Sequence, residues 1–219
     1  MRSYVIWFII VLFVSPLAAN EQDIAQKAYQ LRLEGKKQQA ESLLLNEIRK
    51  KTDDPDVYFE ISRNYFTRTA QDKKYAGKAK SYIKKAIKMD KDNARYQYWA
   101  GVIETHDVIG AEQDIFSVAF APFGIMAAVD RLKDAAALDE GHLHARLILS
   151  GLYQRLPWFL GGNKDKAEDL ADELMEKSAL YGARAWSDIY LDEDQPEKAV
   201  ALWKKMLRED PENAKFLEG

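Results

Sequence analysis

Small and apolar residues recur at helical spacing along most of the chain. One phrase occurs three times, as Ala79-x6-Ala86-x3-Asp90, Ala128-x6-Ala135-x3-Asp139 and Ala199-x6-Met206-x3-Asp210-Pro211. Residues seven apart lie on one face of a helix, and an alanine there indicates a neighbour too close for a larger side chain. The aspartate that ends each phrase, namely Asp90, Asp139 or Asp210, indicates the end of that helix. The pattern predicts the second helix of a repeated helical hairpin.

These phrases resemble the second half of a tetratricopeptide repeat, a helix–turn–helix unit of about 34 residues. Five alanines match the small residue that this family has in its second helix: Ala40, Ala79, Ala128, Ala167 and Ala199. The resemblance covers about residues 21–217 in five degenerate units. It implies an all-α fold, a right-handed solenoid of αα-hairpins.

The spacing of the units is irregular, because the five alanines are 39, 49, 39 and 32 residues apart. When the register is run forward, repeats two to four begin at Pro55, Ala94 and Leu143. Every insertion then falls between the first and second helices of a repeat, where a loop accepts extra residues.

The N-terminus has the three parts of a secretory signal peptide. Arg2 precedes an apolar run from Val5 to Val14, and small residues follow up to Ala19. The run is shorter than the roughly 20 residues that a membrane-spanning helix needs. We therefore expect residues 1–19 to be a signal peptide cleaved after Ala19, and residues 20–219 to form one helical repeat domain. An uncleaved N-terminal anchor is the alternative.

Composition favours a periplasmic protein that is stabilised by burial alone. The 219 residues include no cysteine, so the chain has no disulfide and no cysteine for lipid attachment, and 47% of them are hydrophobic. About 200 mature residues suffice for one solenoid with a continuous core.

Charge is segregated although the net charge is only -3. Basic residues dominate from Arg68 to Arg95, and acidic residues dominate from Asp165 to Glu197. The basic segment is either the solvated outer face of a helix or a patch that meets an acidic partner or anionic lipid headgroups. Nucleic acid is excluded as a partner by the expected export and by the absence of a nucleic-acid motif.

An apolar insertion near 107–127 expands the third unit by fifteen residues. From Ile115 to Val129 no side chain is charged. We expect a connection over Asp107–Ala121 and an elongated second helix with Pro122 in its first turn. The segment has three interpretations: burial over the solenoid core, a lid over a ligand or partner, or shallow membrane contact.

The segment Leu156–Lys164 reads as a structured turn. Its Gly161-Gly162-Asn163-Lys164 lacks the spacing of a phosphate-binding loop. Instead, a proline ends one helix, two glycines make the turn, and Asn163 caps the next helix. We expect Trp158 and Phe159 to pack on the neighbouring unit.

No pattern indicates catalysis, a metal or a cofactor. The only histidines are His106, His142 and His144. His142 and His144 are two residues apart, so they point to different faces of a helix and do not form a metal-binding pair. We expect a protein without enzymatic activity.

The family resemblance implies that the first helix of each repeat presents a concave partner-binding groove. Its register places aromatic, arginine and histidine side chains there, which are typical of recognition surfaces. The positions are Tyr29, Arg32, Phe59, Arg63, Phe66, Tyr98, Trp99, His106, His144, Arg155, Tyr181, Arg184 and Asp188. The lysine–asparagine clamp with which some members bind a C-terminal carboxylate is missing, because Ala25, Tyr29 and Glu60 occupy its positions.

The sequence thus predicts an exported, non-enzymatic interaction module or assembly scaffold that binds a protein or peptide in its groove. A small-molecule-binding accessory component of an envelope transport system is the alternative, in which the apolar insertion closes a pocket. A homodimer through the surface near Trp203, Met206 and Leu207 is also open, because little chain follows to cap it.

Overall fold

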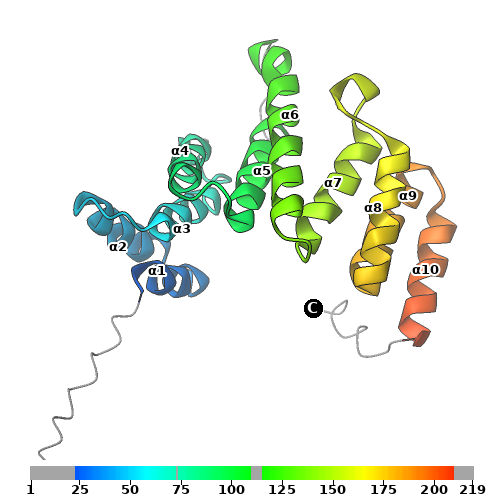
Figure 1. Cartoon of the computed structure of the whole chain (residues 1–219), viewed down its shortest axis with the longest axis horizontal. Helices are drawn as coiled ribbons and strands as arrows, with labels where there is room; N and C mark the ends of the chain where they lie inside the picture. The colour runs from blue at the N-terminus through cyan, green and yellow to red at the C-terminus, as the bar shows by residue number, and fades with distance from the viewer. Residues whose placement is uncertain (1–22, 73, 110–114, 210–219) are drawn as a thin grey trace, which may run out of the picture.

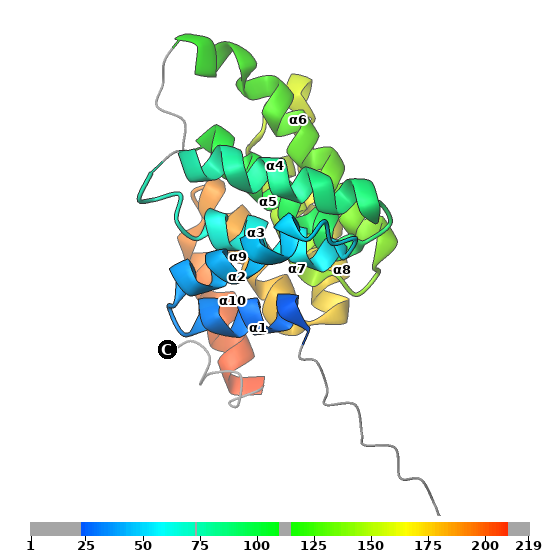
Figure 2. The same cartoon turned by 90° about the vertical axis from the view of Figure 1, so that its left-hand side faces the viewer.

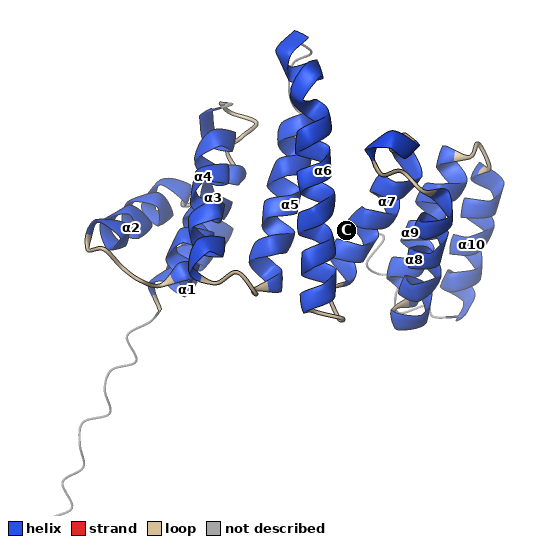
Figure 3. Ribbon diagram, turned by 45° about the horizontal axis from the view of Figure 1, so that its top comes forward, coloured by secondary structure: helices blue, strands red, loops and turns tan. Residues whose placement is uncertain are grey.

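The protein is described by a computed structural model that covers residues 23–72, 74–109 and 115–209. In these ranges the chain forms five consecutive helical hairpins and no strand (Figure 3). They pair α1 (Ile24–Leu33) with α2 (Lys37–Arg49), α3 (Pro55–Phe66) with α4 (Lys74–Met89), α5 (Ala94–Ile109) with α6 (Ile115–Leu138), α7 (Leu143–Arg155) with α8 (Lys164–Lys177), and α9 (Ala179–Asp192) with α10 (Pro196–Glu209). A short 3-10 turn, η1 (Trp158–Leu160), lies between α7 and α8.

The hairpins follow one another side by side from α1 and α2 at one end to α9 and α10 at the other (Figure 1). Seen from the N-terminal side, the successive units overlap along the line of sight (Figure 2). This one-dimensional order confirms the predicted all-α solenoid, in which each unit contacts mainly its neighbours.

The five matching alanines all lie in second helices and are all buried, as the repeat pattern predicted. Two of them also accept a hydrogen bond from the first helix of their unit. The Ser62 hydroxyl donates to the carbonyl of Ala79 at 2.8 Å, and the Ser150 hydroxyl donates to that of Ala167 at 2.9 Å. Small side chains let the two helices come close enough for this contact, so units two and four dock in the same way.

The core consists of two hydrophobic clusters. The first joins α1 to α5 through large side chains such as Leu44, Phe59, Ile83 and Tyr96. The second joins α6 to α9 and includes Leu132, Leu149, Leu174 and Ile189. The clusters meet where α5 and α6 pack closely, because a Cβ atom on Gly101 would lie 2.7 Å from Cγ of Leu132.

The turn between α7 and α8 has the predicted form. Gly161 has a φ of +93°, in the left-handed region that favours glycine. A Cβ atom on Gly162 would lie 1.7 Å from the carbonyl oxygen of Leu156, so this position admits no side chain. The Asn163 side chain accepts a hydrogen bond from the Lys166 amide at 2.9 Å and caps α8.

The prediction for the apolar insertion was wrong in its boundaries. Instead of a long connection over Asp107–Ala121, α5 continues to Ile109 and α6 begins at Ile115. The added residues mainly lengthen the two helices, and Pro122 lies seven residues inside α6 rather than in its first turn. Since an uninterrupted apolar run satisfies its backbone best as a helix, the lengthening is physically favoured over an irregular loop.

The predicted signal peptide, its cleavage site and the end of the chain lie outside the described residues and stay predictions. Near the C-terminal end, Trp203 and Met206 of α10 are half-buried and Leu207 is exposed. No helix in the described ranges has the length and apolar character required to cross a membrane.

Candidate partner-binding surface

A continuous row of aromatic, histidine and charged side chains connects the first helices of all five units. We call it the first-helix row, and it consists of Tyr29, Arg32, Glu60, Arg63, Phe66, Tyr98, Trp99, His106, His144 and Tyr181. Its members come from α1, α3, α5, α7 and α9. First helices face the same side in a stack of like hairpins, so residues far apart in sequence become neighbours.

Arg63 of α3 links the first three units of the row. Its guanidinium carbon lies 5.4 Å from the ring centre of Tyr29 in α1 and 4.7 Å from that of Trp99 in α5. Phe66, one turn further along α3, meets Trp99 edge to face at 5.9 Å and His106 at 5.1 Å. Cation–π and edge-to-face contacts of this kind hold flat side chains in fixed orientations.

Tyr98 and His144 continue the row into the last two units. Tyr98 meets Trp99 at 5.7 Å and His144 at 6.2 Å between ring centres. His144 in turn meets Tyr181 of α9 at 5.0 Å, and the Tyr181 hydroxyl lies 2.8 Å from Nε2 of His144. The row therefore runs without a break from α1 to α9.

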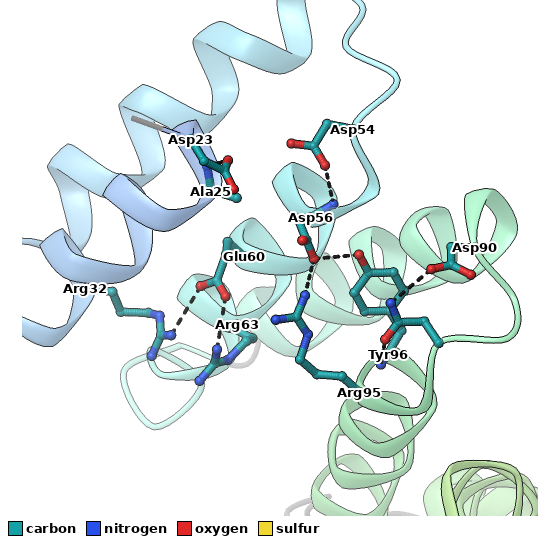
Figure 4. A network of polar contacts seen from close by, with 11 residues as sticks. Asp23, Ala25, Arg32, Asp54, Asp56, Glu60, Arg63, Asp90, Arg95 and Tyr96 are labelled. Atoms are coloured by element: carbon teal, nitrogen blue, oxygen red, sulfur yellow. Dashed lines mark hydrogen bonds and ion pairs between the residues drawn. The ribbon is translucent and has the colours of Figure 1, made fainter. Parts of the chain in front are cut away.

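Glu60 lies at the centre of a charged cluster within the row and pairs with two arginines. Figure 4 shows its carboxylate between Arg32 of α1 and Arg63 of α3, at 3.2 Å and 3.0 Å. The three side chains are 7%, 9% and 18% exposed, respectively. Burial lowers the pKa of Arg63 from its usual value, although Glu60 opposes this shift. The cluster has one more positive than negative charge.

The donors of the two arginines are not all used. Nε of Arg32 and Nε of Arg63 are buried and have no hydrogen-bond partner within the described part of the chain. Because these two atoms have almost no exposed surface, they are unsatisfied donors inside the cluster and are not accessible to a partner.

A second polar cluster, formed by Asp56, Arg95 and Tyr96, fixes α3 against α5 (Figure 4). Arg95 pairs with Asp56, and the Tyr96 hydroxyl donates to the same carboxylate oxygen at 2.6 Å. Burial and this hydrogen bond raise the pKa of Tyr96, so it stays protonated. The cluster orients α5 and with it Tyr98 and Trp99.

His142 and His144 both contact the Tyr98 ring, although their spacing predicted that they point to different faces of a helix. His142 precedes α7, where its Nδ1 atom accepts a hydrogen bond from the Ala145 amide at 3.3 Å, and it packs on Tyr98 at 4.6 Å. Burial lowers the pKa of His142. Within the described ranges no group of three His, Asp or Glu side chains is placed to hold a metal ion.

An apolar pocket of about 500 Å³ lies between the last three units. Its lining comes from α5, α6, α7 and α9 and consists of Thr105, Ile125, Ala128, Leu147, Ile148, Gly151, Leu152, Arg155, Leu156, Arg184 and Asp188. Arg155 pairs with Asp192 at 2.7 Å and Arg184 pairs with Asp188 at 3.2 Å, and both arginines are exposed. The lining thus combines aliphatic side chains with a few polar and charged ones.

The predicted groove residues divide into three groups. The first-helix row contains Tyr29, Arg32, Arg63, Phe66, Tyr98, Trp99, His106, His144 and Tyr181, and the pocket is lined instead by Arg155, Arg184 and Asp188. Phe59 belongs to neither, because its side chain is 0% exposed and packs on Tyr96 in the core, so the structure removes it from the predicted groove. Partner binding by the other residues stays a prediction.

Two features were missed from the sequence. No pattern assigned a role to Glu60 between the arginines, because its partners lie on different helices. The aliphatic face of α7, with Leu147, Ile148 and Gly151, has the i, i+4 spacing of a helix face, but this spacing alone does not distinguish a pocket from the core.

Comparison with known proteins rests on structure alone. No family pattern matches the chain, and no curated protein sequence matches it. A crystal structure of MamA superposes with a TM-score of 0.61 at 20% identity, covering 88% of this chain and 98% of that one. TTC0263, a thermophilic TPR protein of Thermus thermophilus, superposes with a TM-score of 0.64 at 17% identity, covering 89% and 93%.

A larger protein contains the same arrangement as a part. A monomeric mutant of IFIT1 with a bound m7Gppp-AAAA superposes with a TM-score of 0.67 at 15% identity, covering 85% of this chain and 41% of that one. At these identities the likeness concerns the fold. The paired helices, the buried alanines and these superpositions together show that the chain has the tetratricopeptide-repeat fold.

Proposed function

We propose that the protein is a non-enzymatic interaction scaffold that binds an extended peptide or protein segment along its first-helix row. The observation that carries the proposal is the continuity of this row through all five units. An extended segment advances by about 3.3 Å per residue, so it can contact successive helices of a solenoid in turn. The fold shared with TTC0263, a TPR protein, supports an interaction role.

The chemistry of the row suits backbone and carboxylate recognition. Arginine and flat aromatic side chains are enriched in the residues that dominate binding energy at protein interfaces. The cluster of Arg32, Glu60 and Arg63 has a net positive charge. This charge favours a peptide carbonyl or an acidic side chain of the partner.

The pocket between α6, α7 and α9 would receive an apolar anchor side chain of the same segment. Arg184 and Asp188 on its lining lie on α9, which also carries Tyr181 of the row. A peptide that follows the row thus reaches the pocket within the last two units. Apolar anchors in a pocket beside polar contacts are the usual basis of peptide affinity.

A small-molecule-binding accessory role is the second candidate, because the same pocket favours it. Its volume of about 500 Å³ and its aliphatic lining with a few polar groups are within the range of ligand sites. The Gly151→Leu variant, which adds a side chain to the lining, separates the two candidates. It should abolish binding of a small ligand but only weaken a peptide that contacts the whole row.

Export to the periplasm is part of the proposal and rests on residues 1–19. The expected result is an envelope fraction that contains a mature protein beginning at Asn20. Determining the N-terminal sequence of the protein in this fraction tests the prediction. An intact N-terminus in the membrane fraction would instead support the anchor.

Crosslinking capture from envelope fractions tests the binding role. The row variant Arg63→Ala with Phe66→Ala is compared with a control variant, Arg49→Ala with Val200→Ala, which alters exposed residues of α2 and α10 outside the row. We expect one protein to be captured by the wild type and the control but lost with the row variant. The same difference must then hold with the purified partner, after circular dichroism has shown that the row variant is folded.

Equal capture by the row variant would contradict the assignment of the row. Capture that is lost only in Gly151→Leu would place the binding in the pocket.

A further inference from the structure

The pocket between the last three units has an aliphatic wall to which several helices contribute. Ile125 and Ala128 come from the uncharged run of α6, and Leu147, Ile148 and Leu152 come from α7. None of the described residues that line the pocket is aromatic. Its volume of about 500 Å³ lies in the range of sites that take a whole small molecule. Because planar ligands gain from stacking on aromatic side chains, this wall suits a flexible alkyl chain better.

The turn after α7 contributes Leu156 to the wall. The aromatic pair of the same turn is turned away from it, because Trp158 and Phe159 are 85% and 64% exposed and their rings meet edge to face at 5.9 Å. This exposure corrects the prediction that the pair packs on the neighbouring unit. The wall of the pocket thus stays aliphatic at this end of α7.

Two arginine side chains stand where the pocket opens to solvent. Arg155 of α7 and Arg184 of α9 both line it, and their side chains are 54% and 63% exposed. Gly151 lines the wall beside them, and a Cβ atom on it would lie 3.4 Å from Nη1 of Arg155. The Arg155 guanidinium therefore reaches over the wall of the pocket.

The ion pairs of these arginines leave most of their donors unused. The closest contacts run from Nε of Arg155 to Asp192 at 2.7 Å and from Nε of Arg184 to Asp188 at 3.2 Å. Within the described part of the chain, no Nη atom of either arginine donates a hydrogen bond. A guanidinium has five N–H donors in a fixed fork, so the aspartates orient both forks and leave their Nη edges for a ligand.

Donors exceed acceptors at this opening. The Thr105 hydroxyl, which also lines the pocket, already donates to the Gly101 carbonyl at 2.8 Å, and Asp188 accepts from Arg184. The two aspartates balance the two arginines in charge, so a ligand is selected by the free Nη donors rather than by net charge. A carboxylate matches such donors, because its two oxygens accept from a guanidinium fork in parallel.

We infer that the pocket binds a medium-chain fatty acid, with its alkyl chain against the aliphatic wall and its carboxylate on the Nη atoms of Arg155 and Arg184. The inference rests on the second candidate function, a small ligand in this pocket, and names the class of that ligand. No residue of the first-helix row lines the pocket. The row and the fatty-acid site can therefore be tested separately.

Equilibrium dialysis of the full chain against radiolabelled ligands tests the inference. The ligands are decanoate below its micellar concentration, 1-decanol, which has the same chain without the carboxylate, and N-acetylleucine, which has the carboxylate with a short side chain. The fork variant is Arg155→Gln with Arg184→Gln. The matched control is Arg49→Gln with Arg208→Gln, which removes the same charge from exposed residues of α2 and α10 outside the pocket. The Gly151→Leu variant fills the wall.

The wild type should bind decanoate about tenfold or more tightly than 1-decanol, because charge-assisted hydrogen bonds to the carboxylate add to the burial of the chain. The fork variant should bind decanoate about tenfold or more weakly and 1-decanol within about twofold of the wild type. Gly151→Leu should weaken both ligands, and the control should bind both as the wild type does. The apolar N-terminal run is common to all variants, so the differences between them report the pocket.

Equal affinity of the wild type for decanoate and 1-decanol would overturn the inference, and this comparison needs no variant to fold. Unchanged binding of decanoate by Gly151→Leu would place the ligand elsewhere and would also overturn it. N-acetylleucine that binds as tightly as decanoate would assign the pocket to the C-terminal residue of a peptide instead. The row variant should bind decanoate as the wild type does, so failure of either site leaves the other standing.

Discussion

Glu60 joins the first two units because two arginines from different helices share its carboxylate. With all three side chains largely buried, the pair energies are screened less than on the surface. Removing one partner from a buried ion cluster leaves uncompensated charge, which is the main cost of such a change. At the residue scale, Glu60 is therefore expected to matter more for stability than any surface acid.

The Glu60→Ala variant should lower the free energy of unfolding by about 3 kcal/mol, because it leaves Arg32 and Arg63 without their shared partner. The control Glu34→Ala removes the exposed ion pair with Lys36, whose charged atoms are 2.7 Å apart. This control should change the free energy of unfolding by less than about 0.5 kcal/mol. Urea denaturation followed by circular dichroism measures both. Similar losses in the two variants would show that the cluster does not stabilise the fold.

His142 makes stability depend on pH. Its pKa in the folded protein lies below the usual value, mainly because burial disfavours the imidazolium, while Asp139 opposes the shift and His144 and Arg146 add to it. The unfolded chain, with a histidine pKa of about 6.5, therefore takes up the proton first. The contribution of neutral His142 to the free energy of unfolding should be fully present above about pH 6.5. It should decrease as the pH falls towards the lower pKa of the folded protein. Protonation of Nδ1 also ends its hydrogen bond from the Ala145 amide.

His142→Asn should keep the cap of α7 and lose this pH dependence, since asparagine is a good capping residue that does not titrate. We expect the urea midpoint at pH 7.5 to be close to that of the wild type, and the decrease on going to pH 5.5 to be smaller. An unchanged decrease would show that His142 is not the cause of the pH dependence.

At the scale of the element, the hairpins are held together by glycine and alanine at the points of closest approach. Gly182 of α9 is one such point, because a Cβ atom there would lie 2.3 Å from Cα of Met175 in α8. Gly77 of α4 is the opposite case, because a Cβ atom built on it would have no neighbouring atom within 4 Å. The two glycines look alike in the sequence and differ only in what packs on them.

Gly182→Ala should lower the free energy of unfolding by about 2 kcal/mol, because the added methyl group must push α8 and α9 apart. Gly77→Ala should raise it by about 0.5 to 1 kcal/mol, because alanine favours the helix and meets empty space. Thermal and urea unfolding of the two variants give the values. Stabilisation by both substitutions would mean that α8 and α9 lie further apart than described.

At the scale of the whole molecule, the two hydrophobic clusters are coupled through the contact of α5 with α6. Stability in a solenoid is approximately a sum over units and their interfaces, so a weakened interface can separate parts that otherwise unfold together. Gly101 lies at this interface, facing Leu132.

Gly101→Val should separate the unfolding of the two clusters. We expect the peptides of α3 and α4 and those of α8 and α9 to lose hydrogen-exchange protection at one urea concentration in the wild type and at different concentrations in the variant. Hydrogen exchange at increasing urea, read by mass spectrometry, makes the comparison. Coincident loss in the variant would show that the clusters are coupled elsewhere.

The sequence by itself determined the repeating hairpin, the buried alanines and the Asn163 cap, because each depends on residues close together in the chain. Nine of the ten residues of the first-helix row, all except Glu60, are among the groove positions that the register predicted. The sequence did not fix the ends of α5 and α6, because an uncharged run from Ile115 to Val129 contains neither a cap nor a polar face to mark a boundary.

Only the tertiary structure decided which of these residues are open to a partner. Phe59 and Phe66 share a predicted face of α3, yet Tyr96 covers Phe59, whereas Phe66 stays partly exposed beside the rings of Trp99 and His106. Glu60 acquires its role through Arg32, 28 residues away. Local sequence sets the period of a helix, but exposure and pairing depend on which helix packs against it, and that is set by contacts between distant parts of the chain.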